Sequence, residues 1–249
     1  MTMGRMSKSG RRPLFLLLSV LMLCPALFAD SKTPAAAYGW QCGTGSNYFA
    51  GMYRTGDQIE GAAAYITSRF SGVCDTDSNP INNFTNAWTM VASNNGQSWI
   101  QSGFERGFGT GVRHFSQVIS PNLQDSTVYG DWFPYNEDHE YWQTLNSANG
   151  RMYSNVDGYN FLSTTFPVFN HWGTPLQSEF LGEVRYLESD IPGYWPNATG
   201  FWNISTQRRS DHSWQYIPCP YLVSLNSQPS RWAVEGVSCT SFHIYTHTP

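Results

Sequence analysis

The fold is indicated first by one hairpin sequence, TNAWTMVASNNGQSWIQSGFE, residues 85–105. Its two halves are rich in aromatic and β-branched residues, which favour extended backbone. Between the halves lies Asn95-Gly96, a dipeptide that favours the tight turn of a β-hairpin. We therefore expect strands at Thr85–Ala92 and Ser98–Glu105, paired antiparallel.

Similar segments recur along the rest of the chain, with turn residues between them. Aromatic residues make up 16% and charged residues only 13% of the chain, a mixture that favours strands. The alanine-rich segment Gly61–Arg69 is compatible with a helix, but Tyr65-Ile66-Thr67 favours a strand there. Further strands are expected at Ser126–Phe133, Glu140–Leu145, Arg151–Val156, Tyr159–Phe166, Ser178–Glu188, Phe201–Thr206, Trp214–Ile217, Arg231–Gly236 and Ser241–Tyr245.

This pattern of about a dozen short strands predicts an all-β fold. Two packed antiparallel sheets, a β-sandwich, are the expected architecture. No linker or repeat divides residues 38–249, so a single β-sandwich domain is expected there, and we expect it to be a monomer.

The N-terminal segment is typical of a secretory signal peptide. Four positive side chains precede an apolar run, Leu14–Leu23, and small residues follow it. Cleavage after Ala29 or Ala37 would remove a signal peptide and short leader, residues 1–37. A secreted protein is therefore expected, with no membrane partner after cleavage because no later stretch is long and apolar enough to span a bilayer.

The charge of the chain disfavours a nucleic-acid partner. Loss of the four positive charges of the signal peptide takes the formal charge from −4 to −8. A net acidic surface repels phosphate backbones. The glycine-rich loop Gly107–Gly111 lacks the lysine and following helix of a phosphate-binding loop. Glu137-Asp138-His139-Glu140 matches no calcium or zinc pattern, so neither a cofactor nor a metal is predicted.

Secretion makes disulfides the expected state of the four cysteines that remain after cleavage. Three pairings are open, and we favour Cys42–Cys74 with Cys219–Cys239 because each closes a modest local loop. Sequons for N-linked glycosylation begin at Asn83, Asn197 and Asn203.

Two polar side chains on strand-like segments are candidate site residues. By alternation, Gln101 shares a face with Trp99 and Gly103, and Glu183 shares a face with Glu179 and Arg185. If the two strands lie side by side, the Gln101 amide and the Glu183 carboxylate can share one water. Gly103 would leave room for the backbone of a substrate.

Several motifs resemble those of known peptidases. Ile100-Gln101-Ser102-Gly103-Phe104 resembles the motif around the catalytic glutamine of the fungal glutamic peptidases, the eqolisins, and the related segment of the plant neprosin family. Asn86-Ala87-Trp88-Thr89-Met90 resembles the strand that precedes this motif, and Leu181-Gly182-Glu183-Val184 resembles the segment of the second catalytic glutamate. Residues 128–135 are similar to an aromatic strand beside the eqolisin cleft, but lack its glutamate.

The resemblance implies a two-sheet sandwich of the jelly-roll or concanavalin-like type, a function and a set of site residues. Gln101 and Glu183 would be the catalytic dyad of a glutamic endopeptidase, and Trp132, Gly103 and Trp99 would contact a polypeptide substrate. Glu183 would take a proton from the attacking water, while Gln101 would stabilise the oxyanion. Such a base works while ionised, so activity is expected to persist at acid pH.

Two alternatives of another kind stay open at this point. A non-catalytic carbohydrate-binding module would use surface tryptophans as stacking platforms, and a polysaccharide would then be the partner. A glycosidase is disfavoured because Glu179 and Glu183 are about 13 Å apart along an extended strand, too far for a retaining pair. The tryptophans available for stacking are Trp132, Trp142, Trp172, Trp195, Trp202 and Trp214.

Overall fold

The computed structural model describes most of the chain after the N-terminal segment. Residues 36–249 cluster as one compact unit. The described residues, all within it, are 42–43, 45–56, 59–75, 83–107, 109–174, 176–217, 222–238 and 240–247. Among them, no helix is long and apolar enough to cross a membrane.

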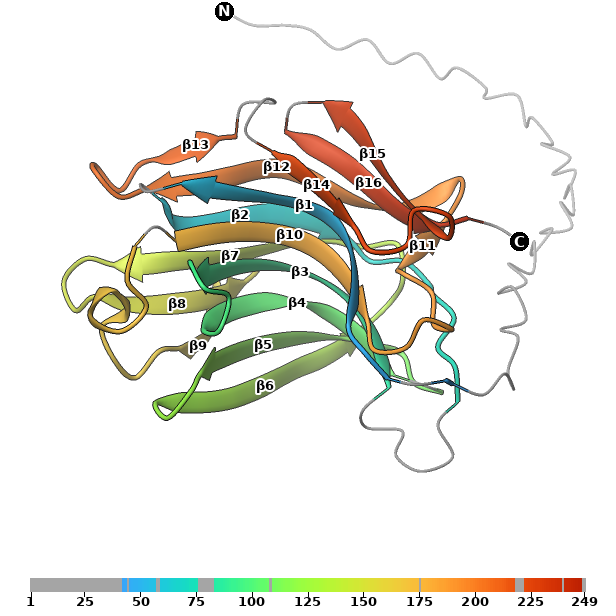
Figure 1. Cartoon of the computed structure of the whole chain (residues 1–249), viewed down its shortest axis with the longest axis horizontal. Helices are drawn as coiled ribbons and strands as arrows, with labels where there is room; N and C mark the ends of the chain where they lie inside the picture. Colours follow the sequence, from blue (N-terminus) through green and yellow to red (C-terminus); the bar gives the residue numbers. More distant parts are fainter. Residues whose placement is uncertain are drawn as a thin grey trace, which may run out of the picture. The chain divides into compact units, whose positions relative to one another are not determined.

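One sheet has seven strands in the order β14-β1-β10-β3-β4-β5-β6, with every neighbouring pair antiparallel (Figure 1). Strands β10 and β4, which carry Glu183 and Gln101, both pair with β3. The bounds of the seven strands are β1 Tyr48–Gly56, β3 Phe84–Ser93, β4 Trp99–Gly107, β5 Val112–Ser120, β6 Gln124–Phe133, β10 Leu176–Val184 and β14 Val223–Asn226.

The second sheet has nine strands in the order β15-β16-β11-β12-β2-β7-β8-β9, with β13 paired to β12. All its pairings are antiparallel except the short contact between β11 and β16. A 3-10 turn, η2, covers Val168–Asn170. The bounds of the strands are β2 Ile59–Thr67, β7 Asp138–Asn146, β8 Arg151–Val156, β9 Tyr159–Ser163, β11 Gly193–Tyr194, β12 Asn197–Arg208, β13 Trp214–Tyr216, β15 Trp232–Ser238 and β16 Ser241–Thr246.

The main hydrophobic core lies between the facing sides of the two sheets. Because side chains alternate along a strand, each sheet contributes every second residue to this core. Members from both sheets are fully buried, among them Ala87, Val91, Phe104, Phe180, Ala62, Ile66 and Phe201. The predicted all-β sandwich is therefore confirmed.

The predicted hairpin is confirmed, with Met90 opposite Gln101 across β3 and β4. The alanine-rich segment is strand β2 and not a helix. Four strands that the sequence analysis did not assign are β1, β5 and the short strands β11 and β14. In β1, Gly51 interrupts the pattern, and a Cβ there would lie 2.2 Å from the Phe180 carbonyl oxygen. In β5, Phe115 and Val118 put apolar residues on both faces, which hides the alternation.

The predicted disulfide between Cys42 and Cys74 is confirmed, with an S–S distance of 2.02 Å. It joins the segment before β1 to the segment after β2. The other predicted pair, Cys219–Cys239, lies outside the described residues. Of the sequons, Asn83 is fully buried and its amide donates to the Cys74 carbonyl, whereas Asn197 and Asn203 are exposed.

Candidate active site

The polar residues predicted from the sequence lie on one face of the seven-stranded sheet. Core residues such as Phe180 and Phe104 point toward the nine-stranded sheet, so their neighbours on the same strands point the other way. We call this outward side the Glu183 face. The strand register puts Glu183, Asn86, Glu105, Arg113 and Trp132 in one row across it, and Glu179, Met90, Gln101 and Gln117 in another.

Gln101 and Glu183 share this face, but their strands are not neighbours. Strand β3 lies between β10 and β4, which corrects the expectation of side-by-side strands. Glu183 is opposite Asn86 and Gln101 is opposite Met90, four residues further along β3. In a flat sheet this places the two Cα atoms roughly 16 Å apart. Their ends therefore meet only if both side chains lean toward each other over Trp88.

Glu183 is a buried carboxyl group held by two donors. Glu183 is only 7% exposed. The Trp88 indole Nε1 donates to Glu183 Oε2 at 3.2 Å, and the Asn86 amide lies 3.5 Å from the same oxygen. Burial raises the pKa of Glu183 to about 7, although these hydrogen bonds and the positive charge of Arg185 oppose the rise. Near neutral pH this group can both accept and donate a proton, as acid–base catalysis requires.

Gln101 is buried to the same degree and is held from two sides. Its Nε2 donates to Gln117 Oε1 at 2.9 Å, and the Trp99 indole approaches the same oxygen at 3.4 Å. Gln117 in turn donates to Thr127. From the inner side, the Ser154 hydroxyl of the other sheet donates to the Gln101 carbonyl at 3.2 Å. An amide nitrogen carries two hydrogens, so the bond to Gln117 uses only one of them.

Two more carboxyl groups line the same face. Glu179 accepts a hydrogen bond from Gln177 at 2.6 Å, and burial, together with the nearby charge of Glu183, raises its pKa to about 7. Glu105 forms an ion pair with Arg113 at 2.6 Å. Arg185 donates to Asn47 and forms no ion pair with Glu183 or Glu179 among the described residues. Glu183 thus keeps its carboxyl group free of a direct cation.

The three residues predicted to bind substrate occupy different surroundings. Trp132 is 55% exposed on the edge strand β6, with the Arg113 guanidinium 5.3 Å from its ring centre. Trp99 is half-buried against the cluster of Trp88, Met90, Phe115 and Leu181 that covers this face. The packing of the strands explains the glycine at position 103, since a Cβ on Gly103 would lie 2.0 Å from the Ala87 carbonyl oxygen. The close approach of β3 therefore requires this glycine.

A histidine cluster lies elsewhere, between the two sheets, with members on β5, on β7 and in the turn between β8 and β9. His114, His139 and Asp157 have possible ligand atoms within 4.8 Å of one another. His139 Nδ1 already contacts Asp157 at 2.6 Å, and His114 Nδ1 contacts the Tyr141 hydroxyl at 2.9 Å. Burial lowers the pKa of His114 to about 4 and keeps this ring neutral. We assign no metal to the cluster, because His139 is already paired with Asp157 and His114 with Tyr141.

Sequence reasoning missed the residues that hold the candidate pair in place. Gln117, which accepts from Gln101, lies on β5, a strand that was not predicted. Ser154 acts from the opposite sheet, and no local pattern indicates such a contact. Asn86 and Trp88 were noted only as part of a motif, while the structure places their donors on Glu183.

Comparison with known proteins supports the fold. No protein-family model and no curated protein matches the sequence. Two crystal structures of scytalido-glutamic peptidase, one with a peptide-based transition-state analogue and one with a transition-state analogue inhibitor, match with TM-scores of 0.52 and 0.53 at 11% identity. A structure of SCP-B, a member of the eqolisin family, in complex with the tripeptide Ala-Ile-His, matches with a TM-score of 0.50 at 12% identity.

Each of these matches covers 82% of this chain and 100% of the other. The predicted distant resemblance to the eqolisin glutamic peptidases is therefore confirmed at the level of the fold. The resemblance to the neprosin family stays a prediction.

Proposed function

We propose that the protein is a glutamic-peptidase-like hydrolase in which Glu183 and Gln101 act on one water molecule. The observation that carries this proposal is a carboxyl group in a residue only 7% exposed, on the same sheet face as the Gln101 amide. Fold similarity to peptidases that bind peptide analogues supports a polypeptide as the substrate.

The reaction follows from the chemistry of these two groups. The Glu183 carboxylate takes a proton from water as the water oxygen attacks the carbonyl carbon of the peptide bond. An N–H of Gln101 stabilises the negative oxygen of the tetrahedral intermediate. Glu183 then gives the proton to the leaving nitrogen, and the carbon–nitrogen bond breaks. For this, the Gln101 side chain must turn from Gln117 toward Glu183, above Trp88.

The raised pKa of Glu183 changes the expected working range. A base must be ionised, and Glu183 ionises at about pH 7. Hydrolysis by this route should therefore rise through pH 7, above the acid range that the sequence suggested, and a pH profile tests the two expectations.

Substrate contacts are proposed for the exposed part of the same face. Trp132 offers an open aromatic ring in the same row as Glu183, and Trp99 lies beside Gln101. The Cys42–Cys74 disulfide fits an oxidising compartment. We propose that the protein is secreted after removal of residues 1–37 and acts as a monomer without a cofactor.

The test is hydrolysis of denatured casein and of a proline-rich protein by the purified protein, between pH 3 and 9. We expect peptide release by the wild type and none by Glu183→Gln. Glu137→Gln is the matched control, because Glu137 is a half-exposed carboxylate beside His139 of the other sheet. Full activity of a folded Glu183→Gln protein would disprove the role of the dyad.

A further inference from the structure

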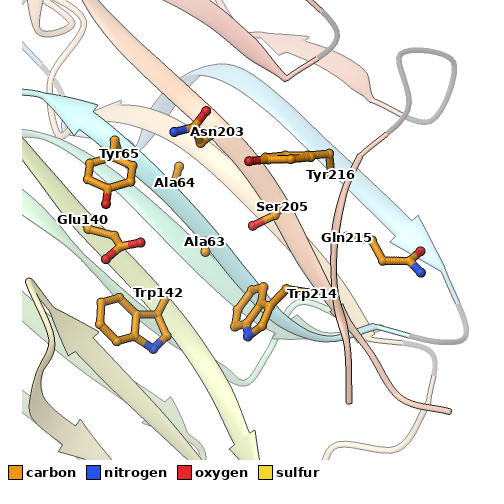
Figure 2. A pocket seen from close by; sticks show the side chains of 10 residues that line it. All are labelled: Ala63, Ala64, Tyr65, Glu140, Trp142, Asn203, Ser205, Trp214, Gln215 and Tyr216. Atoms are coloured by element: carbon orange, nitrogen blue, oxygen red, sulfur yellow. The ribbon is translucent and has the colours of Figure 1, made fainter. Parts of the chain in front are cut away.

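A second candidate site lies on the nine-stranded sheet, on its side away from the core. It is an open groove of about 650 Å³ across β7, β2, β12 and β13. Figure 2 shows its lining, and we call it the aromatic groove. Its walls include Tyr65, Glu140, Trp142, Asn203, Trp214 and Tyr216.

The register of four strands builds this groove. Trp142, Ala63, Ser205 and Tyr216 are opposite one another in one row across the sheet. The two small residues in the middle of the row form a floor, and the large rings stand around it (Figure 2). Replacing either small residue by a large one would fill the groove.

Three of the four aromatic side chains of the groove are exposed, and Trp142 is partly buried. Tyr216 is 62% exposed, Trp214 is 41% exposed and Tyr65 is 38% exposed. Singly exposed aromatic residues are ordinary on a protein surface, but a group around one hollow marks a binding site. The volume of the groove is within the range of ligand sites in proteins.

The polar groups of the groove include both donors and acceptors, but the Glu140 carboxylate can only accept. The Tyr65 hydroxyl donates to the Glu140 carboxylate, so this donor is already used. Asn203 has a left-handed backbone with φ of 54° and lies where the pairing of β12 with β2 shifts between Trp202 and Ser205. Such a bulge turns a side chain out of its regular direction, here toward the groove (Figure 2).

We propose that the aromatic groove binds a carbohydrate chain. A pyranose ring has an apolar C–H face, which stacks on flat indole and phenol rings. Its edge carries hydroxyl groups, which donate to carboxylate and amide oxygens such as those of Glu140 and Asn203. Small floor residues between large rings leave space for a sugar ring to lie flat.

A proline-rich peptide is the other ligand class that stacks on aromatic rings, but the polar groups disfavour it. Proline has no backbone N–H, so such a peptide presents chiefly carbonyl oxygens. These oxygens can accept from the indole N–H groups and the Asn203 amide, but the peptide would cover the Glu140 carboxylate without donating to it. Sugar hydroxyls supply the missing donors.

The groove and the Glu183 face belong to different sheets. Carbohydrate binding is therefore independent of hydrolysis. In combination, the groove would hold the protein at a polysaccharide surface while the other sheet acts on protein.

Electrophoresis in native gels that contain one soluble polysaccharide each tests this inference. The probes are β-glucan, xylan, galactomannan and pectin. The protein is produced in a bacterial host, so that Asn203 of the sequon carries no glycan. We expect at least one polysaccharide to retard the wild type, and Trp142→Ala and Trp214→Ala each to weaken the binding about tenfold or more.

Trp195→Ala is the matched control. Trp195 is 59% exposed, lies outside the groove and packs against Tyr245 at a ring distance of 5.7 Å. It should bind like the wild type, and so should Glu183→Gln, which separates this inference from the proposed peptidase. Equal thermal unfolding of the tryptophan variants shows that they are folded.

The inference is overturned if none of the four polysaccharides retards the protein, or if retardation persists in both groove variants. It is also overturned if polyproline quenches the tryptophan fluorescence of the wild type, but not of Trp142→Ala, while no polysaccharide binds. That result would assign the groove to a peptide.

Discussion

The Glu183 face and the aromatic groove differ in which side chains are buried and which are exposed to solvent. On the Glu183 face the polar groups are hidden, since Gln101 is 6% and Glu183 is 7% exposed. In the groove the rings are open, and Tyr216 is 62% exposed. One sheet thus buries a carboxyl group beside Trp88, whose indole donates to it, while the other presents its aromatic residues to solvent.

This difference separates two kinds of chemistry. Burial raises the pKa of Glu183 to about 7, which suits a group that must move a proton. Glu140 in the groove also has a raised pKa through desolvation, but it keeps more contact with water. A solvated acceptor beside exposed rings suits reversible binding, with no need for a perturbed charge. The predictions below test this division.

The largest expected effect is that of Gln101→Ala on hydrolysis. Loss of a donor to a developing oxyanion costs about 10²- to 10³-fold in kcat. The KM should change less, because the amide acts on the transition state. The measurement is steady-state hydrolysis of a peptide substrate at pH 8. Polysaccharide retardation should be unchanged in the same variant, and a parallel loss of both activities would break the division between the two sheets.

Gly103→Ala should cause the largest loss of stability. Its Cβ would lie 2.0 Å from the Ala87 oxygen and 2.7 Å from the Trp88 Cα, both backbone atoms that cannot turn aside. Overpacking of this kind costs about 3 kcal/mol or more. Urea unfolding measures it. Gly236→Ala is the control, because nothing lies within 4 Å of a Cβ there. Similar urea midpoints for the two variants would show that β3 and β4 can move apart at Gly103 without a loss of stability.

Glu183→Gln should raise stability in a pH-dependent way. The pKa of Glu183 is about 7 in the folded protein, against an ordinary value of 4.5. The folded protein therefore holds this proton more tightly, and the wild type loses stability as the pH rises between these values. The variant has no such loss, so it should gain up to about 3 kcal/mol at pH 8 and little at pH 4.

Urea unfolding at the two pH values measures this gain. Glu140→Gln serves as the counterpart in the groove and should show a much smaller pH-dependent difference, because Glu140 is half-buried and solvent screens its charge. An equal gain of stability at pH 8 in both variants would mean that burial does not make the Glu183 carboxyl group differ from that of Glu140.

Much of the fold could be predicted from local sequence. The turn at Asn95-Gly96 and the flanking strands fixed the register in which Gln101 faces Met90. Strand β5 could not be predicted, because Phe115 is buried on the Glu183 face and Val118 in the main core. A strand with apolar residues on both faces loses the alternation that identifies it.

The candidate site could be predicted only in part, because strand order is not a local property. Alternation placed Glu183 and Gln101 on faces of their own strands, but nothing local indicates that β3 lies between them. The groove depends on Ser205 and Ala63 meeting across β12 and β2, with a shift in pairing beside Asn203. Such contacts join segments more than a hundred residues apart, and no single segment carries a signal for them.

The smallest expected effect is that of Trp88→Phe on the pH dependence of hydrolysis. The Trp88 indole donates to Glu183 Oε2 at 3.2 Å and so favours the ionised form. Phenylalanine keeps an aromatic ring in the cluster but has no donor, so the pKa of Glu183 should rise further, by one unit or less, about 1.4 kcal/mol at most. The acid limb of kcat/KM should then move to higher pH by the same amount. Trp142→Phe in the groove should leave this limb in place. A limb that stays fixed in Trp88→Phe would show that the proton of Glu183 does not control the reaction, and the carboxyl group would then be only a buried part of the sheet.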